Sequence, residues 1–330
     1  MKYTPTIAII GAGISGLSCA SQLQQAGINV TLFDKSRGPG GRMSTRRGEG
    51  WQCDHGAQYF TARDPSFRAE VACWQAAGVV AAWQPRLVVF GDEDEHQPDA
   101  GLERFVGTPR MTAPARFLAD RLDVCLQTTV SALIPEGGRW RLETRETGLT
   151  PACYDAVLLA VPAPQAVPLL QVFSGELAAI PAQAVMRGSW TLMLRYTQRP
   201  ALDFDAAFVN RGPLRWVARD SSKPGRAGEE TWLLHATAEW SEAHIEDAAE
   251  TVAAALLTAF AELGAPPPAA WTAHRWRYAD SAPALTQECV WDAALRIGLC
   301  GDWVNGGKVE GAWLGGRALG QRVAATFEAS

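Results

Sequence analysis

The sequence predicts a two-domain α/β protein, with a Rossmann-like nucleotide-binding domain and a second α+β domain built on a mixed or antiparallel sheet. Three observations predict this class. A strand at 7–10, a glycine-rich turn, a helix and a strand at 30–33 open the chain. A late strand at 295–300 and the Gly-Asp pair behind it indicate that distant segments complete the same domain. The 330 residues, 47% of them hydrophobic, suffice for more than one core.

The nucleotide-binding domain is predicted to be discontinuous, because its first and last pieces lie at opposite ends of the chain. We assign residues 1–62, 105–165 and 285–330 to it, and residues 63–104 and 166–284 to the second domain, which would bind the substrate. A small antiparallel meander is expected in the middle, with strands at 124–130 and 140–144, a turn at 135–138 and a strand at 154–162 that returns to the main sheet.

The glycine-rich turn predicts a site for a dinucleotide pyrophosphate. Gly11 permits the tight turn, Gly13 lets the backbone approach the phosphates, and Gly16 lets the helix pack closely on the strand. The helix, which ends near Gly27, presents unpaired N–H groups and the positive end of its dipole. Asp34 ends the second strand, where a carboxylate accepts hydrogen bonds from a ribose diol. This unit alone does not distinguish NAD from FAD.

A second phosphate-binding element follows directly in residues 37–42, where Arg37 and Arg42 frame a run that contains three glycines. Guanidinium groups on such a loop are bidentate donors for a pyrophosphate. The alternative, a solvated basic turn, fits its position behind a complete nucleotide-binding unit less well. The loop resembles that of the glutathione-reductase-like flavoproteins, which include the amine oxidases. The resemblance implies FAD, and no cysteine sits in an obvious position for covalent attachment, so we expect noncovalent FAD.

The same resemblance implies roles for the late segment. Gly301 and Asp302 would bind the flavin ribityl chain, and the helix expected from Gly311 would point its N-terminus at the pyrimidine edge of the ring, where its dipole stabilises negative charge. The cofactor-binding set is therefore predicted as Gly11, Ala12, Gly13, Ile14, Ser15, Gly16, Asp34, Lys35, Arg37, Gly41, Arg42, Met43, His55, Gly56, Ala57, Gln58, Tyr59, Val130, Gly301, Asp302, Gly311 and Ala312.

The remaining segments predict the second domain. We expect a helix at 64–77, strands at 83–90, 189–197, 214–218, 232–238 and 271–278, and one long helix from Ser241 to about Leu263. The acidic run at 91–96 is expected to be a solvated hairpin tip. A second G-x-G-x-x-G motif is missing from the sequence, so a nicotinamide substrate would have to enter the flavin pocket itself.

Charge and composition argue against several other classes. The net charge of −5 gives no electrostatic case for nucleic acid or for an anionic membrane. The first strand follows Met1 so closely that we expect no signal peptide, and no stretch is long enough to span a membrane. The seven widely spaced cysteines contain no C-x-x-C pair, so neither a metal site nor a disulfide relay is expected, and a reducing cytoplasm is the predicted compartment.

Four stretches narrow the family: residues 53–61, 233–237, 274–278 and 300–313. Together they make the chain resemble the bacterial renalases over nearly its whole length. The resemblance implies an FAD oxidase of isomeric 2- and 6-dihydro forms of NAD(P), which are returned to NAD(P)⁺ while O₂ becomes H₂O₂. Loss of hydride makes the pyridine ring aromatic, so placing the donor carbon against flavin N5 is the main task.

Three residues are the candidate catalytic set: His235, Tyr59 and Trp303. His235 lies in an apolar strand, where a buried structural histidine is the equal alternative. Tyr59 follows a turn expected near the flavin, and Trp303 follows the ribityl-binding pair; either could instead pack in the core. Trp276 and Arg277 are weaker candidates, because alternation along a strand places them on opposite faces.

Two other functions stay open. An amine oxidase or desaturase has the same predicted scaffold, and a flavin-bound sensor without turnover is a third class. The sequence shows no aromatic cage for an amine, since it has only five tyrosines. Recognition of an NADP-type substrate would need basic residues at the pocket mouth, for which Arg211, Arg215 and Arg219 are candidates, with surface charge as the alternative.

Overall fold

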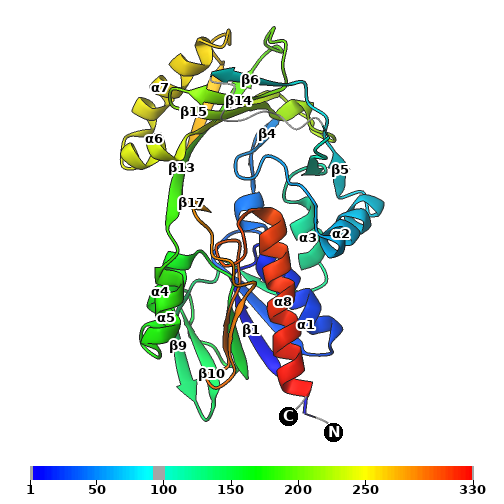
Figure 1. The fold of residues 1–330 in the computed structure, drawn as a ribbon, viewed down its shortest axis with the longest axis vertical. Helices are drawn as coiled ribbons and strands as arrows, with labels where there is room; N and C mark the ends of the chain where they lie inside the picture. The colour runs from blue at the N-terminus through cyan, green and yellow to red at the C-terminus, as the bar shows by residue number, and fades with distance from the viewer. Residues whose placement is uncertain (1–2, 92–100, 329–330) are drawn as a thin grey trace.

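The computed structural model describes residues 3–91 and 101–328, and two six-stranded sheets form its framework (Figure 1). The first sheet has five parallel strands and one antiparallel edge strand. In spatial order it contains β18 (Val290–Asp292), β19 (Ile297–Leu299), β12 (Ala156–Leu159), β1 (Thr6–Ile10), β2 (Asn29–Asp34) and β8 (Asp123–Leu126). Segments from both ends of the chain therefore share one sheet, and the predicted α/β class is confirmed.

Two helices, α1 (Ile14–Gln25) and α8 (Lys308–Glu328), lie side by side on this sheet (Figure 1). Glycines let their backbones approach closely. A Cβ atom at Gly316 would lie only 2.0 Å from the backbone oxygen of Ser15, and one at Gly320 would lie 2.8 Å from the Cβ of Gln22. The helix that the sequence places from Gly311 begins three residues earlier, at Lys308.

A three-stranded meander of β9 (Val130–Glu136), β10 (Arg139–Thr144) and β11 (Gly148–Leu149) lies beside helices α4 (Ala163–Leu170) and α5 (Gly175–Ala182). The predicted turn is present, with Gly137 and Gly138 at φ +58° and +77°. The prediction of one continuous strand over residues 124–130 is wrong. Strand β8 ends at Leu126, Gln127 adopts a left-handed φ of +53°, and the chain leaves the first sheet and enters β9 of the meander.

The second sheet is mixed, as predicted, because one of its five strand pairs is parallel. In spatial order it contains β17 (Ala270–Ser281), β13 (Met186–Tyr196), β16 (Glu230–Ala236), β15 (Leu214–Arg219), β14 (Ala206–Arg211) and β6 (Leu87–Gly91). The sheet arches across the top of Figure 1, and helices α6 (Ala238–Ala243) and α7 (Ala249–Ala261) lie on its outer side.

Two expectations in this region are wrong. The long helix predicted from Ser241 is divided into α6 and α7, because the chain leaves the helical path after Ala243, where His244 adopts φ −116°. The first of them begins before Ser241, since the Thr237 side chain caps it by accepting from Trp240 N at 3.2 Å. The strand expected from Trp83 begins at Leu87. The Trp83 ring is buried instead, and its Nε1 donates to Ser222 Oγ at 3.1 Å. The acidic run falls outside the described residues beyond Gly91.

Shorter elements connect the two sheets. They are β3 (Thr45–Gly48), β4 (Trp51–Asp54), α2 (Pro65–Ala76), β5 (Val80–Ala82), β7 (Phe105–Gly107), α3 (Ala113–Ala119) and two 3₁₀ turns, η1 (Gly41–Met43) and η2 (Asp220–Ser222). Helix α2 matches its prediction, and Asp64 caps it by accepting from Ser66 N at 2.8 Å. One apolar core joins Leu17 of α1, Phe67 of α2 and Leu233 of β16, and the domain boundaries stay a prediction. Within residues 3–91 and 101–328, none of the helices combines the length and apolar character needed to cross a membrane.

The α1–α8 contact yields a prediction. Gly316→Ala should lower the free energy of unfolding by about 1–3 kcal/mol, because the added methyl group meets the Ser15 backbone oxygen, which cannot move independently of α1. Chemical denaturation measures the loss. Gly175→Ala is the matched control, since a Cβ there meets nothing within 4 Å. Equal stability of the two variants would contradict the close helix contact.

Candidate active site

A pocket of about 780 Å³ lies between the N-terminal ends of α1 and α8 and the second sheet. Ten of the predicted cofactor residues line it: Gly13, Ile14, Ser15, Arg42, Met43, Gly56, Ala57, Gly301, Asp302 and Ala312. Its opposite wall comes from the second sheet and includes Arg187, Arg211, Arg215, His235 and Trp276. The pocket thus brings together ten of the residues predicted to bind the cofactor and one of the three catalytic candidates, His235.

The glycine-rich turn has the geometry that a pyrophosphate needs. Gly11 adopts φ +107°, and a Cβ there would lie 2.5 Å from the Ala160 backbone oxygen. A Cβ at Gly16 would lie 2.0 Å from the Gly11 oxygen, so helix and turn are in direct contact. At Gly13, by contrast, a Cβ would meet nothing within 4 Å, and α1 begins there without a side-chain cap. The helix N–H groups thus face open space where phosphates fit.

Asp34 supports this turn from the end of β2. Its Oδ2 accepts from Ala12 N at 2.7 Å, and its Oδ1 accepts from Ser36 N at 2.7 Å. Lys35 and Arg37 are exposed. Asp34, Lys35 and Arg37 lie outside the pocket lining, together with the other predicted cofactor residues Gly11, Ala12, Gly16, Gly41, His55, Gln58, Tyr59, Val130 and Gly311. Contact of these residues with FAD stays a prediction.

Arg42 and Asp302 form one unit at the cofactor end. Nη1 of Arg42 donates to Asp302 Oδ2 at 2.8 Å and to the Ala279 carbonyl at 3.1 Å, while Nη2 donates to the other carboxylate oxygen. The sequence assigned the arginine to the pyrophosphate and the aspartate to the ribityl chain separately. In the structure the two side chains neutralise each other and connect η1 to β17 and to the loop after β19.

Two of the three catalytic candidates lie outside the pocket lining. Trp303 is only 1% exposed, packs in the apolar core, and donates from Nε1 to the Val161 carbonyl at 3.0 Å. Tyr59 is half-buried, with its ring 5.5 Å from that of Trp216 and with the Arg104 guanidinium 5.4 Å from its centroid. Both positions match the packing alternative that the sequence left open.

His235 does line the pocket, and so does Trp276. Both are anchored on one backbone oxygen, since Trp276 Nε1 donates to the His55 carbonyl at 2.8 Å and His235 Nε2 lies 3.4 Å from it. Arg277, the next residue on β17, points away and pairs with Glu246 at 2.6 Å. The two neighbouring side chains thus lie on opposite faces of the strand, as the alternation predicts, and Trp276 is the one that lines the pocket.

His235 belongs to a cluster of three histidines, which we call the histidine cluster: His55 and His274, outside the pocket lining, pack edge to face with centroids 4.8 Å apart, and His235 lies beside the His55 carbonyl. Burial disfavours the imidazolium and lowers the pKa of His55 to about 3, with positive neighbours adding to the effect. Burial likewise lowers the pKa of His235 to about 4 and that of His274 to about 4. All three rings are neutral at pH 7, so His235, the one of the three that lines the pocket, offers a polar contact without a charge of its own.

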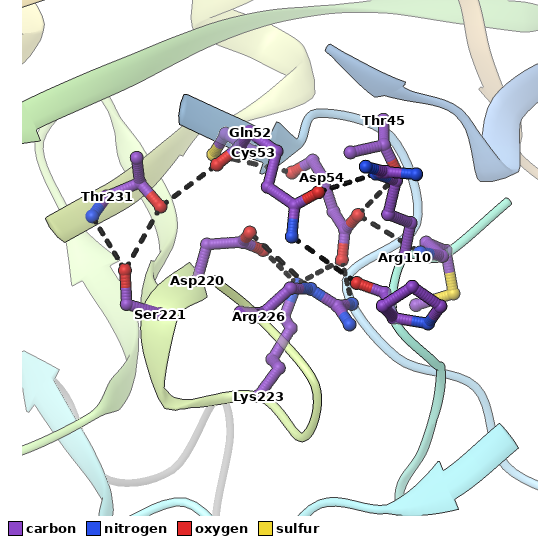
Figure 2. A network of polar contacts seen from close by, with 12 residues as sticks. Thr45, Gln52, Cys53, Asp54, Arg110, Asp220, Ser221, Lys223, Arg226 and Thr231 are labelled. Carbon is purple, nitrogen blue, oxygen red and sulfur yellow. Dashed lines mark hydrogen bonds and ion pairs between the residues drawn. The ribbon is translucent and has the colours of Figure 1, made fainter. Parts of the chain in front are cut away.

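A buried charge cluster behind the pocket was missed by the sequence interpretation. We define it as Asp54, Asp220, Lys223 and Arg226, and Figure 2 shows the four side chains pointing toward one another. The residues 220–226 read as an ordinary polar loop, so the sequence carries no signal of their burial. Gln58, which was expected at the polar edge of the flavin, points into this cluster and accepts from Lys223 Nζ at 3.1 Å.

Comparisons with known proteins agree with this geometry. A model of the NAD(P)-binding Rossmann-like domain matches residues 9–72. A hydroxyneurosporene desaturase of Rubrivivax gelatinosus is 36% identical over 141 residues, which cover 36% of this chain and 26% of the desaturase. A coproporphyrinogen III oxidase of Staphylococcus aureus is 42% identical over 62 residues, which cover 18% of this chain and 13% of that enzyme. The matches thus span about a quarter or less of these relatives.

Similar solved structures extend the likeness to nearly the whole chain. A protein assigned as a protoporphyrinogen oxidase from Exiguobacterium sp. 255-15 superimposes with a TM-score of 0.78 at 14% identity, over 98% of this chain and 99% of that one. The chain therefore shares the fold of that protein. A cyclohexylamine oxidase from Brevibacterium oxydans gives a TM-score of 0.74 at 12% identity over 99% and 100% of the two chains. The uncapped start of α1 and the open side of Gly13 leave room for a dinucleotide pyrophosphate, which is consistent with the predicted FAD.

The histidine cluster makes the free energy of unfolding depend on pH. The unfolded chain takes up protons near the ordinary histidine pKa of 6.5, whereas the folded histidines resist protonation down to about 3–4. Their contribution to stability is therefore complete above about pH 6.5 and is lost as the pH falls below it. We expect the loss of unfolding free energy between about pH 7.5 and about pH 5 to be smaller in His274→Gln than in the unaltered protein. An unchanged loss in His274→Gln would refute the assignment.

Proposed function

We propose that this protein is an FAD oxidase of isomeric 2- and 6-dihydro-NAD(P), which it returns to NAD(P)⁺ while O₂ is reduced to H₂O₂. The charge arrangement of the pocket supports this proposal best. Within the described part of the chain, each carboxylate lining the pocket has an arginine partner: Asp302 has Arg42 at 2.8 Å, Asp280 has Arg187 at 3.1 Å, and Glu239 has Arg187 at 3.4 Å. Cationic amines would find no unpaired carboxylate there, whereas a neutral ring on an anionic dinucleotide suits such a wall.

Bound FAD would supply the hydride acceptor and the site of oxygen reduction. The protein groups that would hold it are the Gly13 turn, the α1 N-terminus, the Gly56–Ala57 segment and the Arg42–Asp302 pair. The second-sheet wall would hold the substrate ring opposite. Neutral His235 can bond a carboxamide or a ribose hydroxyl, and the indole of Trp276 offers an apolar surface to a pyridine ring. Hydride loss from a dihydropyridine requires no base, so an uncharged histidine meets the need.

An amine oxidase or desaturase is the second candidate, and the similarity to a cyclohexylamine oxidase and to a hydroxyneurosporene desaturase favours it. The residues that line the pocket argue against an amine oxidase. Trp276 is the one Trp, Tyr or Phe side chain among the described residues that line the pocket, so no aromatic cage is formed there. Cytoplasm remains the proposed compartment, because all seven cysteines are free thiols.

Anaerobic stopped-flow mixing of the FAD-loaded protein with defined reductants tests the function. We expect 2- or 6-dihydro-NAD to bleach the flavin rapidly with NAD⁺ as product, and peroxide to form when air is admitted. Ordinary 4-dihydro-NADH and a panel of primary amines are the parallel controls, and we expect them to react slowly or not at all. Bleaching by amines while both isomers stay inert would reject the proposal and favour the amine oxidase.

The two arginines at the outer end of the pocket predict a preference for phosphate-bearing substrate. Arg211 and Arg215 line it from β14 and β15, whereas Arg219 pairs with Glu230 at 2.6 Å outside it. The double variant Arg211→Ala/Arg215→Ala should raise the KM for the 2′-phosphorylated isomer about five- to tenfold more than for the unphosphorylated one. Arg277→Ala, outside the pocket, controls for general loss of positive charge. Equal effects on both substrates would refute phosphate recognition by this pair.

A further inference from the structure

The charge cluster is buried, and burying charged groups costs desolvation free energy. The side chains of Asp54, Asp220 and Lys223 are 0% exposed, and that of Arg226 is 2% exposed. Such a set seldom stabilises a protein more than an apolar replacement would, because desolvation cancels most of the attraction. Its benefit is therefore expected to lie in fixing the position of something. The neighbour that it holds is Gln58, which follows the pocket-lining residues Gly56 and Ala57 in the chain.

Lys223 determines which way the Gln58 amide points. Its ammonium group has three donors and no acceptor, and the three are used by Asp54 Oδ2 at 3.1 Å, Asp220 Oδ1 at 2.7 Å and Gln58 Oε1 at 3.1 Å. Since only the oxygen of the amide can face a cation, the Nε2 group must point the other way. It donates to the backbone carbonyls of Asp54 at 2.6 Å and Gly56 at 3.1 Å.

This orientation fixes the peptide plane between Gly56 and Ala57. Its carbonyl accepts from Gln58 Nε2, and its N–H, on Ala57, donates to the Arg42 carbonyl at 2.9 Å. Both ends of the plane are thus held by hydrogen bonds. Both residues line the pocket, and a Cβ at Gly56 would lie 1.9 Å from the Arg42 oxygen, so this wall has no room to shift toward η1.

We propose that Gln58 is a positioning residue of the flavin site, oriented by Lys223, and that it tunes the reduction potential of bound FAD by fixing the Gly56–Ala57 peptide. A peptide group carries a dipole of about 3.5 D, and rotating this pocket-lining peptide would change the relative stability of the neutral oxidised flavin and the anionic reduced flavin when FAD is bound. The inference rests on FAD in the pocket and not on the identity of the substrate.

The sequence offers a matched control for the loss of a buried amide. Gln52 is 8% exposed against 6% for Gln58, and it too bridges a cation and a carbonyl, accepting from Arg110 Nε at 2.5 Å and donating to the Pro109 carbonyl at 3.4 Å. Its contacts do not include the Gly56–Ala57 peptide. A purely structural role would therefore affect both glutamines alike, whereas a positioning role would separate them.

The test is the midpoint potential of FAD bound to Gln58→Leu and Gln52→Leu, measured by dye-coupled titration without substrate. Gln58→Leu should change the ratio of reduced to oxidised flavin at a fixed potential about tenfold, which is about 30 mV for two electrons, while Gln52→Leu should change it less than twofold. Gln58→Glu covers the case in which the leucine variant does not fold. An ionised carboxylate still accepts from Lys223 but cannot donate to Gly56, so it should shift the ratio as well.

The proposal is overturned if the potential of FAD is unchanged in Gln58→Glu and Gln58→Leu, or if Gln52→Leu shifts it equally. Thermal melting of all three variants runs beside the titration, because stability reports the structural role and the potential reports the positioning role. Since neither measurement uses a substrate, failure of the dihydro-NAD isomers to reduce the flavin would not affect this result.

Discussion

The burial of Asp54 is the constraint on which the arrangement of the pocket depends. Burial alone would raise the pKa of this carboxyl, but the charges of Lys223 and Arg226, with a hydrogen bond from Thr45, outweigh it and hold the pKa below the usual range. An ionised, fully buried carboxylate must have all its partners in place. Those partners come from β3, from the loop before α3, where Met111 N donates at 3.1 Å, and from the loop after β15. One side chain thereby connects the second sheet to the segments next to the nucleotide turn.

The same cluster distributes its charge unevenly. Burial and the neighbouring Asp54 raise the pKa of Asp220 to about 6, even though Lys223 donates to it at 2.7 Å. Burial opposes the positive charge of Lys223, but the two carboxylates more than compensate and raise its pKa above the ordinary value. The lysine therefore is a protonated donor to Asp54, Asp220 and Gln58 at neutral pH. Because its ammonium group can only donate, the oxygen of the Gln58 amide must face it, which gives that amide a single orientation.

The nucleotide-binding half could be predicted because its requirements are local. Gly11, Gly13 and Gly16 are specified by backbone conformation and close approach within a few residues, and a fixed spacing records those needs directly. The strands of both sheets were also predictable in large part, since their apolar runs follow the period of the sheet. The wrong predictions concern where helices and strands begin, end or are interrupted. Thr237 starts α6 ahead of Ser241, and a left-handed Gln127 ends β8, and both depend on single side chains or dihedral angles that periodicity does not record.

The substrate wall could not be predicted to the same extent, because long-range contacts determine it. Trp303 and Trp276 are both tryptophans on or next to strands, yet one donates to Val161 inside the core and the other faces the pocket. Whether a tryptophan packs in the core or lines the pocket depends on residues more than a hundred positions away. Composition and strand alternation therefore do not decide between the two. Asp54 and Lys223 are likewise 169 residues apart. Neither residue type is expected in a core, and each becomes tolerable there only because the other is present. A single sequence therefore predicts a phosphate site, because the residues that form it are close together in the chain. It does not predict the charge cluster, because its members come from distant positions and each requires the others.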